Sequence, residues 1–161
     1  MKKNRILVVV SEANLPACPK HVNVAVKFDE NIKVAFIEDG FGYSFNDLSE
    51  GPLPERVLCG YNLCREERDR SLIEFAGEDL ATVHLTDLLT MLLKQPNGEP
   101  GDLIIDSSAN IFYVLDSKKK RCAAIAYWTK FGWCLDVHVI TDKNQWLIGN
   151  RVFFYQKKLD Y

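Results

Sequence analysis

The last third of the chain, residues 110–156, constrains the fold most, because it reads as consecutive antiparallel strands rich in aromatic residues. Short polar connections separate four apolar or β-branched runs, which are residues 111–115, 123–128, 133–140 and 151–155. The segment also contains all three tryptophans of the chain, Trp128, Trp133 and Trp146. Aromatic and β-branched residues suit a pleated, half-buried surface. Residues 103–156 therefore predict a four-stranded C-terminal meander.

Alternation along residues 133–140 predicts which face of one strand is buried. The expected core face carries four apolar side chains, Trp133, Leu135, Val137 and Val139. The opposite face carries Cys134, Asp136 and His138. We expect Asp136 and His138 to be exposed or to line a groove.

Shorter strand-like segments occupy the N-terminal half of the chain. They are residues 5–10, 22–28 and 33–38. These segments predict an N-terminal meander within residues 1–76. Asp39–Gly42 is expected to be a turn, because its glycines allow positive φ angles. The charged run 65–70 is expected to be a solvated hairpin tip, because residues 72–75 look extended.

One amphipathic helix is predicted at residues 83–95. Its apolar face is a stripe of leucines at helical spacing, Leu85, Leu88, Leu89, Leu92 and Leu93. Thr82 is the expected N-cap, and Asp87 lies early in the helix, where the helix dipole favours negative charge. The sequence therefore predicts a single α+β domain over residues 1–161, with a mainly antiparallel sheet and this helix. A strongly curved or barrel-like sheet is an open alternative, because barrels remove exposed edges.

Composition and charge narrow the function classes. The chain has 161 residues, of which 47% are apolar and 26% charged, as in ordinary globular domains. Its net charge of −2 argues against a strongly electrostatic nucleic-acid binder. No apolar run approaches the roughly 18 residues that cross a membrane, and Ile6–Val10 is shorter than the apolar core of a signal peptide, about 7–15 residues. The five scattered cysteines indicate reduced thiols. We therefore expect a cytoplasmic protein with no membrane partner.

Several segments resemble a set of uncharacterised small bacterial proteins, known mainly from metagenomic genomes of candidate phyla. The similarity rests on the helix and loop TDLLTMLLKQPNGEPGDLI, on the strand NIFYVLD and on the later segment GNRVFF. The segment KVAFIEDGFG also resembles a region of that set. The resemblance implies no activity and no site residue.

A zinc site was considered at Cys18, His21, Cys59 and Cys64, because zinc binds thiolates and imidazoles in closely spaced pairs. The spacing from Cys59 to Cys64 is wide for such a pair. A strand over residues 56–64 would also send these two side chains to opposite faces. The sequence therefore favours ordinary thiols, and no metal or other cofactor is expected.

Catalytic motifs are not apparent in the sequence. Cys134 and His138 share a strand face with Asp136, but neighbours two positions apart lie about 6–7 Å apart on a strand. A nucleophile and its base need roughly 2.6–3.2 Å. Gly40–Gly42 lacks the helix and lysine that follow a phosphate-binding loop. The sequence favours a non-enzymatic role and leaves an enzyme of unrecognised type as a third alternative.

Basic and aromatic residues of the predicted meander suggest a binding surface. Its candidate residues are Lys118, Lys119, Lys120, Arg121, Tyr127, Trp128, Trp133, His138 and Arg151. Cations that follow a backbone, together with aromatics that stack on bases, are typical of single-strand nucleic-acid platforms. Aromatic residues also simply fill cores, and lysines protect sheet edges.

Tyr, Trp and Arg are equally the usual hot-spot residues of protein interfaces. Small domains without catalytic motifs often act by presenting a face or an edge strand to another chain. We therefore expect a non-catalytic protein-binding or inhibitory module whose partner is unidentified. Single-stranded nucleic-acid binding is the alternative.

Overall fold

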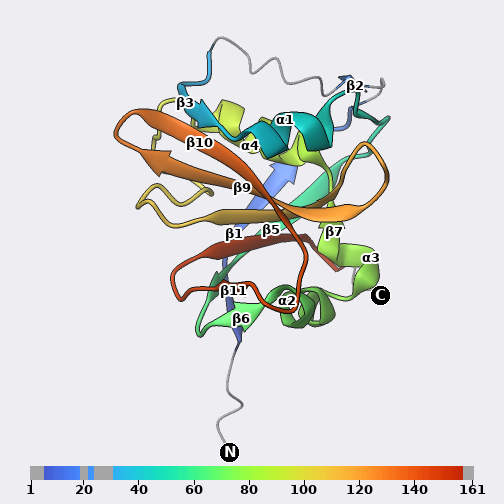
Figure 1. The fold of residues 1–161 in the computed structure, drawn as a ribbon, viewed down its shortest axis with the longest axis vertical. Coiled ribbons are helices and arrows are strands. Elements are labelled where there is room, and N and C mark those ends of the chain that lie inside the picture. The colour runs from blue at the N-terminus through green and yellow to red at the C-terminus, as the bar shows by residue number, and fades with distance from the viewer. Residues whose placement is uncertain (1–5, 19–21, 24–30, 158–161) are drawn as a thin grey trace, which may run out of the picture.

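A computed structural model describes residues 6–18, 22–23 and 31–157 (Figure 1). Its main element is one eight-stranded sheet. Seven strands follow one another across it, in the order β1 (Leu7–Leu15), β5 (Arg56–Leu63), β12 (Arg151–Tyr155), β8 (Asn110–Leu115), β9 (Arg121–Thr129), β10 (Gly132–Val139) and β3 (Val34–Ile37). The short strand β7 (Thr82–Val83) also pairs with β8. Most pairs are antiparallel, and the β12–β8, β10–β3 and β7–β8 pairs are parallel.

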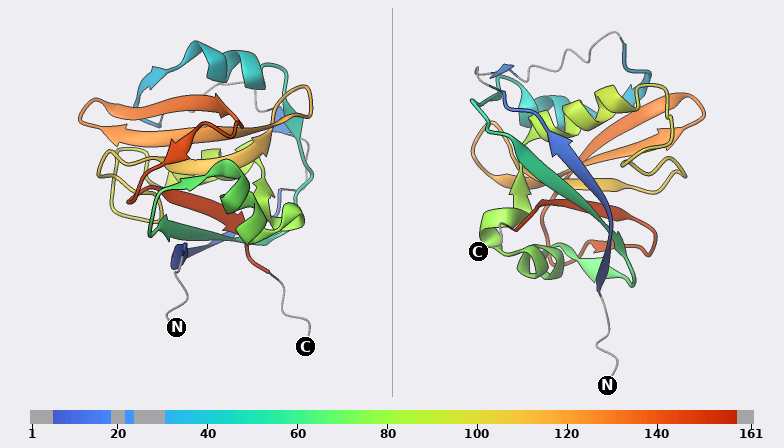
Figure 2. Two further views of the ribbon diagram at one scale, coloured as in Figure 1. Left: turned by 60° about the horizontal axis from the view of Figure 1, so that its bottom comes forward. Right: turned by 180° about the vertical axis from the view of Figure 1, so that it is seen from behind.

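Helices cover both faces of this sheet (Figures 1 and 2). Helices α1 (Asp39–Phe45) and α4 (Leu85–Lys94) lie on one face. Helices α2 (Asp69–Ala76) and α3 (Glu78–Ala81) lie on the other. Four two-residue strands form two small ladders, β2 (Val22–Asn23) with β4 (Ser49–Glu50) and β6 (Glu67–Arg68) with β11 (Gln145–Trp146). In the described part of the chain, no helix is both long and apolar enough to span a bilayer.

Two hydrophobic clusters lie on opposite faces of the sheet. Adjacent residues of one strand belong to different clusters. Phe153 stacks on Phe112 on the α4 side, with ring centroids 4.6 Å apart. The next residue, Phe154, stacks on Tyr113 on the α2 side at 6.5 Å. The alternating side chains of a strand make this possible. The central strands therefore read as almost continuous apolar runs, because both of their faces are buried.

The α+β class and the mainly antiparallel sheet are confirmed. Strands β8, β9 and β10 are antiparallel neighbours, as expected for the C-terminal meander. The last strand departs from that meander, because β12 lies between β5 and β8. It thereby joins the N-terminal and C-terminal strands into one sheet. The sheet is not a closed barrel, because β1 and β3 are its two ends.

The predicted N-terminal meander is wrong. Strand β1 pairs with β5, while β3 pairs in parallel with β10 at the opposite end of the sheet. Of the expected middle strand at residues 22–28, only β2 at Val22–Asn23 is described, and it pairs with β4. Long-range pairing therefore replaces the hairpins that the short connections suggested.

The prediction of a single helix is also wrong, since the described residues form four. The expected helix at 83–95 is α4, and its N-cap is His84 rather than Thr82. The expected turn at Asp39–Gly42 begins α1, which buries Phe41 and Phe45. The expected extended segment after the charged run is α2, which buries Leu72 and Ile73. Short helices of seven or eight residues give too few periodic positions to stand out in the sequence.

Gly132 allows β3 to approach β10 closely, and we expect its replacement to break that contact. Its φ is +130°, and a Cβ there would lie 2.6 Å from the Lys33 carbonyl oxygen. Gly132→Ala is therefore expected to lower the free energy of unfolding by about 2–4 kcal/mol. Gly42→Ala in α1 is the matched control, because a Cβ there meets nothing within 4 Å. Urea denaturation followed by tryptophan fluorescence measures both variants. Equal unfolding midpoints for the two variants would contradict the close approach of β3.

Candidate functional site

A pocket of about 970 Å³ lies where β1 and β12 end and β5 begins. Its wall is built from residues 14–16, residues 53–57, Leu80, His84 and the 155–156 segment. Six of these residues are aliphatic or proline, namely Leu15, Pro16, Leu53, Pro54, Val57 and Leu80. The volume and the mainly apolar wall are typical of ligand pockets, which add a few well-placed polar groups.

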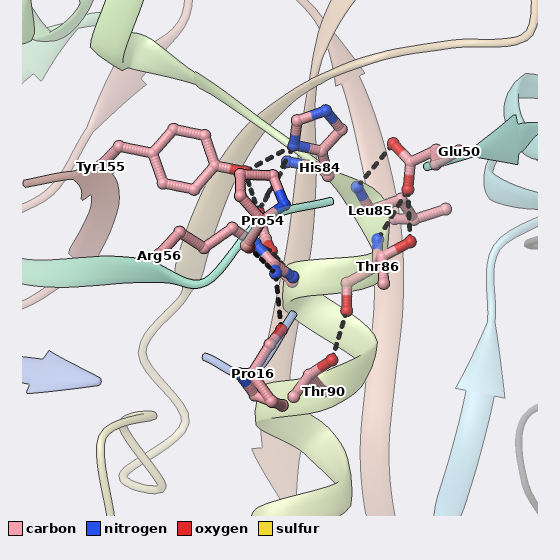
Figure 3. A network of polar contacts seen from close by, with 10 residues as sticks. Pro16, Glu50, Pro54, Arg56, His84, Leu85, Thr86, Thr90 and Tyr155 are labelled. Carbon is pink, nitrogen blue, oxygen red and sulfur yellow. Dashed lines mark hydrogen bonds and ion pairs between the residues drawn. The ribbon is translucent and has the colours of Figure 1, made fainter. Parts of the chain in front are cut away.

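An ion pair between Arg56 and Asp87 lies beside this pocket. Asp87 of α4 is fully buried, and its Oδ1 accepts from Arg56 Nε at 2.6 Å. The remaining guanidinium bonds reach the carbonyl oxygens of Pro16 and Pro54, both at 3.0 Å (Figure 3). Arg56 thus ties α4 to the segments that follow β1 and precede β5. Because its charge is matched by Asp87, Arg56 is not an open site for an external anion.

Tyr155 and His84 extend this network into the pocket wall (Figure 3). The Tyr155 hydroxyl donates to Asp87 Oδ2 and lies 2.5 Å from His84 Nδ1. The His84 backbone N–H also donates to Asp87 Oδ2, at 2.9 Å. Burial, and then the negative charge of Asp87, raise the pKa of Tyr155 above its ordinary value. Tyr155 therefore remains a neutral phenol that holds the His84 ring in one orientation.

Glu50 of β4 occupies the N-terminus of α4 (Figure 3). Its carboxylate accepts from the backbone N–H groups of Leu85 at 3.1 Å and Thr86 at 2.8 Å. The Thr86 hydroxyl donates to the same carboxylate at 2.7 Å. The donors that would otherwise attract a phosphate or an oxyanion at this helix terminus are therefore already used within the protein.

The side chains of the described pocket wall limit the chemistry that they could perform. The described wall holds no Ser, Thr, Cys or Lys that could act as a nucleophile. The α4 amides that could form an oxyanion hole are bonded to Glu50. The imidazole of His84 also belongs to the wall, and this side chain is 39% exposed.

A second buried carboxylate, Asp69 at the start of α2, lies on the other face of the sheet. Its Oδ1 accepts from the Tyr113 hydroxyl at 2.6 Å and from Trp146 Nε1 at 2.7 Å. Burial and then the charge of Asp69 raise the pKa of Tyr113. These contacts join α2, β8 and β11, and the group has a structural role.

The predicted basic tip is exposed, but it is separated from the aromatic residues of β9. Lys118, Lys119 and Lys120 lie in the exposed turn between β8 and β9. Arg121 donates to Glu78 Oε2 at 2.6 Å and to Thr82 Oγ1 at 2.8 Å. Strand β9 runs from Arg121 to Thr129, so Tyr127 and Trp128 are at its opposite end.

The structure does not place the other predicted binding residues on one surface. Trp133 is fully buried and donates from Nε1 to the Gln95 carbonyl at 2.8 Å, so its ring offers no face to a ligand. Trp128 is half-buried and packs edge-to-face on Trp133. Arg151 is half-buried and donates to Asn62 Oδ1 and the Asp102 carbonyl. Its burial lowers the pKa of the guanidinium.

His138 lies on the α2 side of the sheet, as the alternation predicted for the face opposite Trp133. It stacks on Trp146 at 5.6 Å, and its Nε2 lies 3.0 Å from Asp136 Oδ2. Cys134 shares this face but is buried. Val139, an expected core residue, is exposed near the end of β10.

The zinc hypothesis is tested only in part. His21 lies outside the described residues. Cys59 is buried within β5, whereas Cys64 is exposed just beyond that strand. Among the residues that the structure describes, no three His, Cys, Asp or Glu side chains form a metal-binding group.

Sequence reasoning missed the four residues of the polar network. Arg56, His84 and Tyr155 are far apart in the chain and carry no motif. Asp87 offered the one usable signal. It lies one turn before Met91 on the buried and otherwise apolar side of α4, and a charge there requires a partner. The sequence alone does not identify that partner.

Comparisons of the chain with protein-family models, with curated proteins and with solved structures find no match.

Removing Arg56 is expected to destabilise the fold strongly, because Asp87 would remain as an uncompensated buried charge. Arg56→Met should lower the free energy of unfolding by about 3–5 kcal/mol, and adding Asp87→Leu should restore most of it. Arg121→Met is the control, because its partner Glu78 is 75% exposed and such pairs contribute about 0–1 kcal/mol. Urea denaturation measures all three variants. A loss for Arg56→Met as small as that for Arg121→Met would contradict the buried ion pair.

Stability is expected to fall at alkaline pH. Burial raises the pKa of Cys122 to about 12, and it raises the pKa values of Tyr113 and Tyr155. In the unfolded chain a thiol loses its proton near about pH 8.5 and a phenol near about pH 10. At pH values between the unfolded-state pKa and the raised native pKa of each group, the unfolded chain binds fewer protons than the native protein. The free energy of unfolding therefore decreases as pH rises.

Urea midpoints between pH 7 and 11 measure this decline. Cys122→Ala and Tyr155→Phe should each make this decline shallower, because each removes one group with a raised pKa. A midpoint that stays constant or rises over this range would show that the native pKa values of these groups are not raised above those of the unfolded chain.

Proposed function

We propose that this chain is a non-catalytic protein-binding domain that takes an extended segment of another protein along β1 and into the pocket. The observation that carries the proposal is that the pocket lies at the C-terminal end of an edge strand. Asn14 and Leu15 end β1, and Pro16 follows them directly. All three residues also line the pocket. A segment added beside β1 would therefore reach the pocket without leaving the sheet.

Strand β1 has the properties of an edge that accepts another strand. It is the terminal strand of the sheet, and β5 is its partner among the described strands (Figure 2). Val8, Val9 and Val10 are 37%, 52% and 43% exposed. Unpaired backbone groups along such an edge supply affinity to an added strand, and side-chain pockets supply specificity. A bulge between Val9 and Ser11 leaves Ser11–Leu15 as the regular half that leads to the pocket.

Charge at the pocket rim indicates which segment fits. Glu55 lines the pocket, Glu12 contacts Gln156 of the wall at 3.5 Å, and Asp79 is adjacent to Leu80 in α3. All three carboxylates are exposed, and Lys157 is the exposed cation that follows the wall residue Gln156. The rim is therefore acidic, whereas the interior is apolar. Complementarity favours a partner segment with an apolar side chain beside a lysine or arginine.

The acidic rim disfavours nucleic acid as the occupant of this pocket, because a phosphate backbone would be repelled. The exposed lysines at 118–120 belong to the separate turn between β8 and β9. No described aromatic side chain of the predicted platform lies with them at that turn. Protein binding at β1 and the pocket is thus the better supported of the two functions.

Selection from a displayed library of random linear peptides tests the proposal. The native chain should enrich peptides that carry an apolar residue beside a basic one. Asn14→Trp places a large ring at the exposed end of β1 and should weaken binding of a selected peptide by at least about tenfold. A control substitution away from β1 should change this affinity by no more than about twofold. That control is Gln145→Trp, an equally exposed polar residue on β11.

Two results would overturn the proposal. The first is a selection that enriches no consensus peptide, or one whose consensus peptide binds the Asn14→Trp variant as tightly as it binds the native chain. The other is a concentration-dependent dimer in sedimentation experiments that Asn14→Trp abolishes, which would make a second copy the occupant of this edge.

A further inference from the structure

We infer that Glu12 selects the sequence of the segment that pairs with β1. This segment carries a lysine or arginine opposite Glu12 and, two positions away, an apolar residue opposite Asn14 that enters the pocket. The inference deepens the proposed function, because it names the sequence class of the partner, and it rests on that function for the presence of an added strand. Glu12 is thereby a specificity-determining residue of the binding edge.

The regular half of β1 fixes the spacing of the two positions. Its register with β5 is unbroken over Ser11–Leu15, because the bulge precedes Ser11. Side chains on one face of a strand are two positions apart, so Glu12 and Asn14 share a face. A regular strand added along the open side of β1 has the same period. Its residues opposite Glu12 and Asn14 are therefore also two positions apart.

The two faces of this half of β1 differ in exposure. Ala13 and Leu15 belong to the hydrophobic cluster on the α4 side and are 3% and 2% exposed. Glu12 and Asn14 alternate with them along the strand, and both are exposed. The face that carries Glu12 is therefore open to a long charged side chain of an added strand.

The Glu12 side chain is on the α2 side of the sheet. Its register partner Cys59 also pairs with Phe154, which belongs to the α2-side cluster, and directly opposite residues share a face. Burial, and then the negative charge of Glu12, raise the pKa of the Cys59 thiol. The Glu12 carboxylate also accepts from Gln156 Nε2 of the pocket wall, at 3.5 Å. Glu12 is therefore beside the pocket and on the same face as Asn14.

The charge of Glu12 is not matched within the described part of the chain. The ion pairs of those residues involve other carboxylates, and the contact with Gln156 is to a neutral amide. Lys157 follows Gln156 and is exposed, but it makes no ion pair with Glu12. Opposite charges that face each other across two strands stabilise the pairing, and like charges destabilise it. We therefore expect a lysine or arginine opposite Glu12.

Asn14 determines the position of the apolar residue. It lines the pocket together with Val57, its register partner on β5, and Leu80 of α3. A side chain opposite Asn14 is consequently beside the aliphatic part of the wall. Glu55 and Asp79 also contribute to the acidic rim, but they precede β5 and belong to α3 respectively. Because neither is on β1, neither imposes a fixed spacing on an added strand.

Peptide selection with charge-reversed variants of the full chain tests the inference. The native chain should enrich lysine or arginine two positions from the apolar residue, whereas Glu12→Lys should enrich aspartate or glutamate there. Two controls carry the same charge change, Glu55→Lys in the pocket wall and Glu66→Lys at an exposed position between β5 and β6. Both controls should still enrich lysine or arginine. They separate pairing at one position from attraction by net charge.

The affinity of one peptide selected by the native chain measures the strength of the pairing. Glu12→Lys should weaken its binding by about three- to thirtyfold, because a pair of opposite charges becomes a pair of like charges. Replacing the basic residue of the peptide by glutamate should restore most of this loss, and high salt should reduce both effects. Glu12→Gln, which keeps the size of the side chain, should remove the charge preference without reversing it. Urea denaturation verifies that each variant is folded, as expected for an exposed position.

Three results would overturn the inference. The first is enrichment of basic residues at a spacing other than two from the apolar residue. The second is a Glu12→Lys variant that still enriches lysine or arginine at that position. The third is a reversal of the preference by Glu55→Lys instead of Glu12→Lys. Either order of the two residues along the peptide supports the inference, because the order reports only the direction in which the segment pairs with β1.

The two proposals fail in different ways. If the selected peptides bind weakly to Asn14→Trp but carry no basic residue two positions from the apolar one, the protein-binding function stands and the role of Glu12 is wrong. If no form of the chain enriches a consensus peptide, the protein-binding function is wrong, and the role of Glu12 is rejected with it.

Discussion

The burial of one carboxylate, Asp87, organises the functional end of this molecule. A charge on the buried side of a helix is tolerated only when it is paired and fully hydrogen-bonded. Its partners come from β5 and β12, through Arg56 and Tyr155, and from the backbone at the N-cap of α4. Meeting that requirement brings the ends of distant strands to the start of α4. The pocket is the space that remains between them.

The sheet makes this convergence possible because it is covered on both faces. The central strands send adjacent side chains into two separate hydrophobic clusters, so neither face is available as a binding surface. The parts of the sheet that remain accessible are its edges and the ends of its strands. Strand β1 supplies an edge, and the pocket lies at its end. The proposed binding site therefore lies at a part of the sheet that the core leaves uncovered.

The sequence predicted what local periodicity encodes and missed what long-range pairing determines. The leucine stripe identified α4, and alternation identified β8, β9 and β10. The insertion of β12 between β5 and β8 depends on contacts between residues far apart in the chain, so no local sequence pattern predicts it. Aromatic residues were equally ambiguous. The same hydrophobicity that suggested a stacking surface buries Trp133 completely, because apolar area is favoured in the core. The site itself joins residues that only the fold brings together.

The internal hydrogen bonds of the site also argue for recognition rather than catalysis. Arg56 is matched by Asp87, the α4 amides are occupied by Glu50, and the Tyr155 proton is donated to Asp87. Catalysis of acyl or phosphoryl transfer needs donors aimed at developing charge, and these donors are already used within the protein.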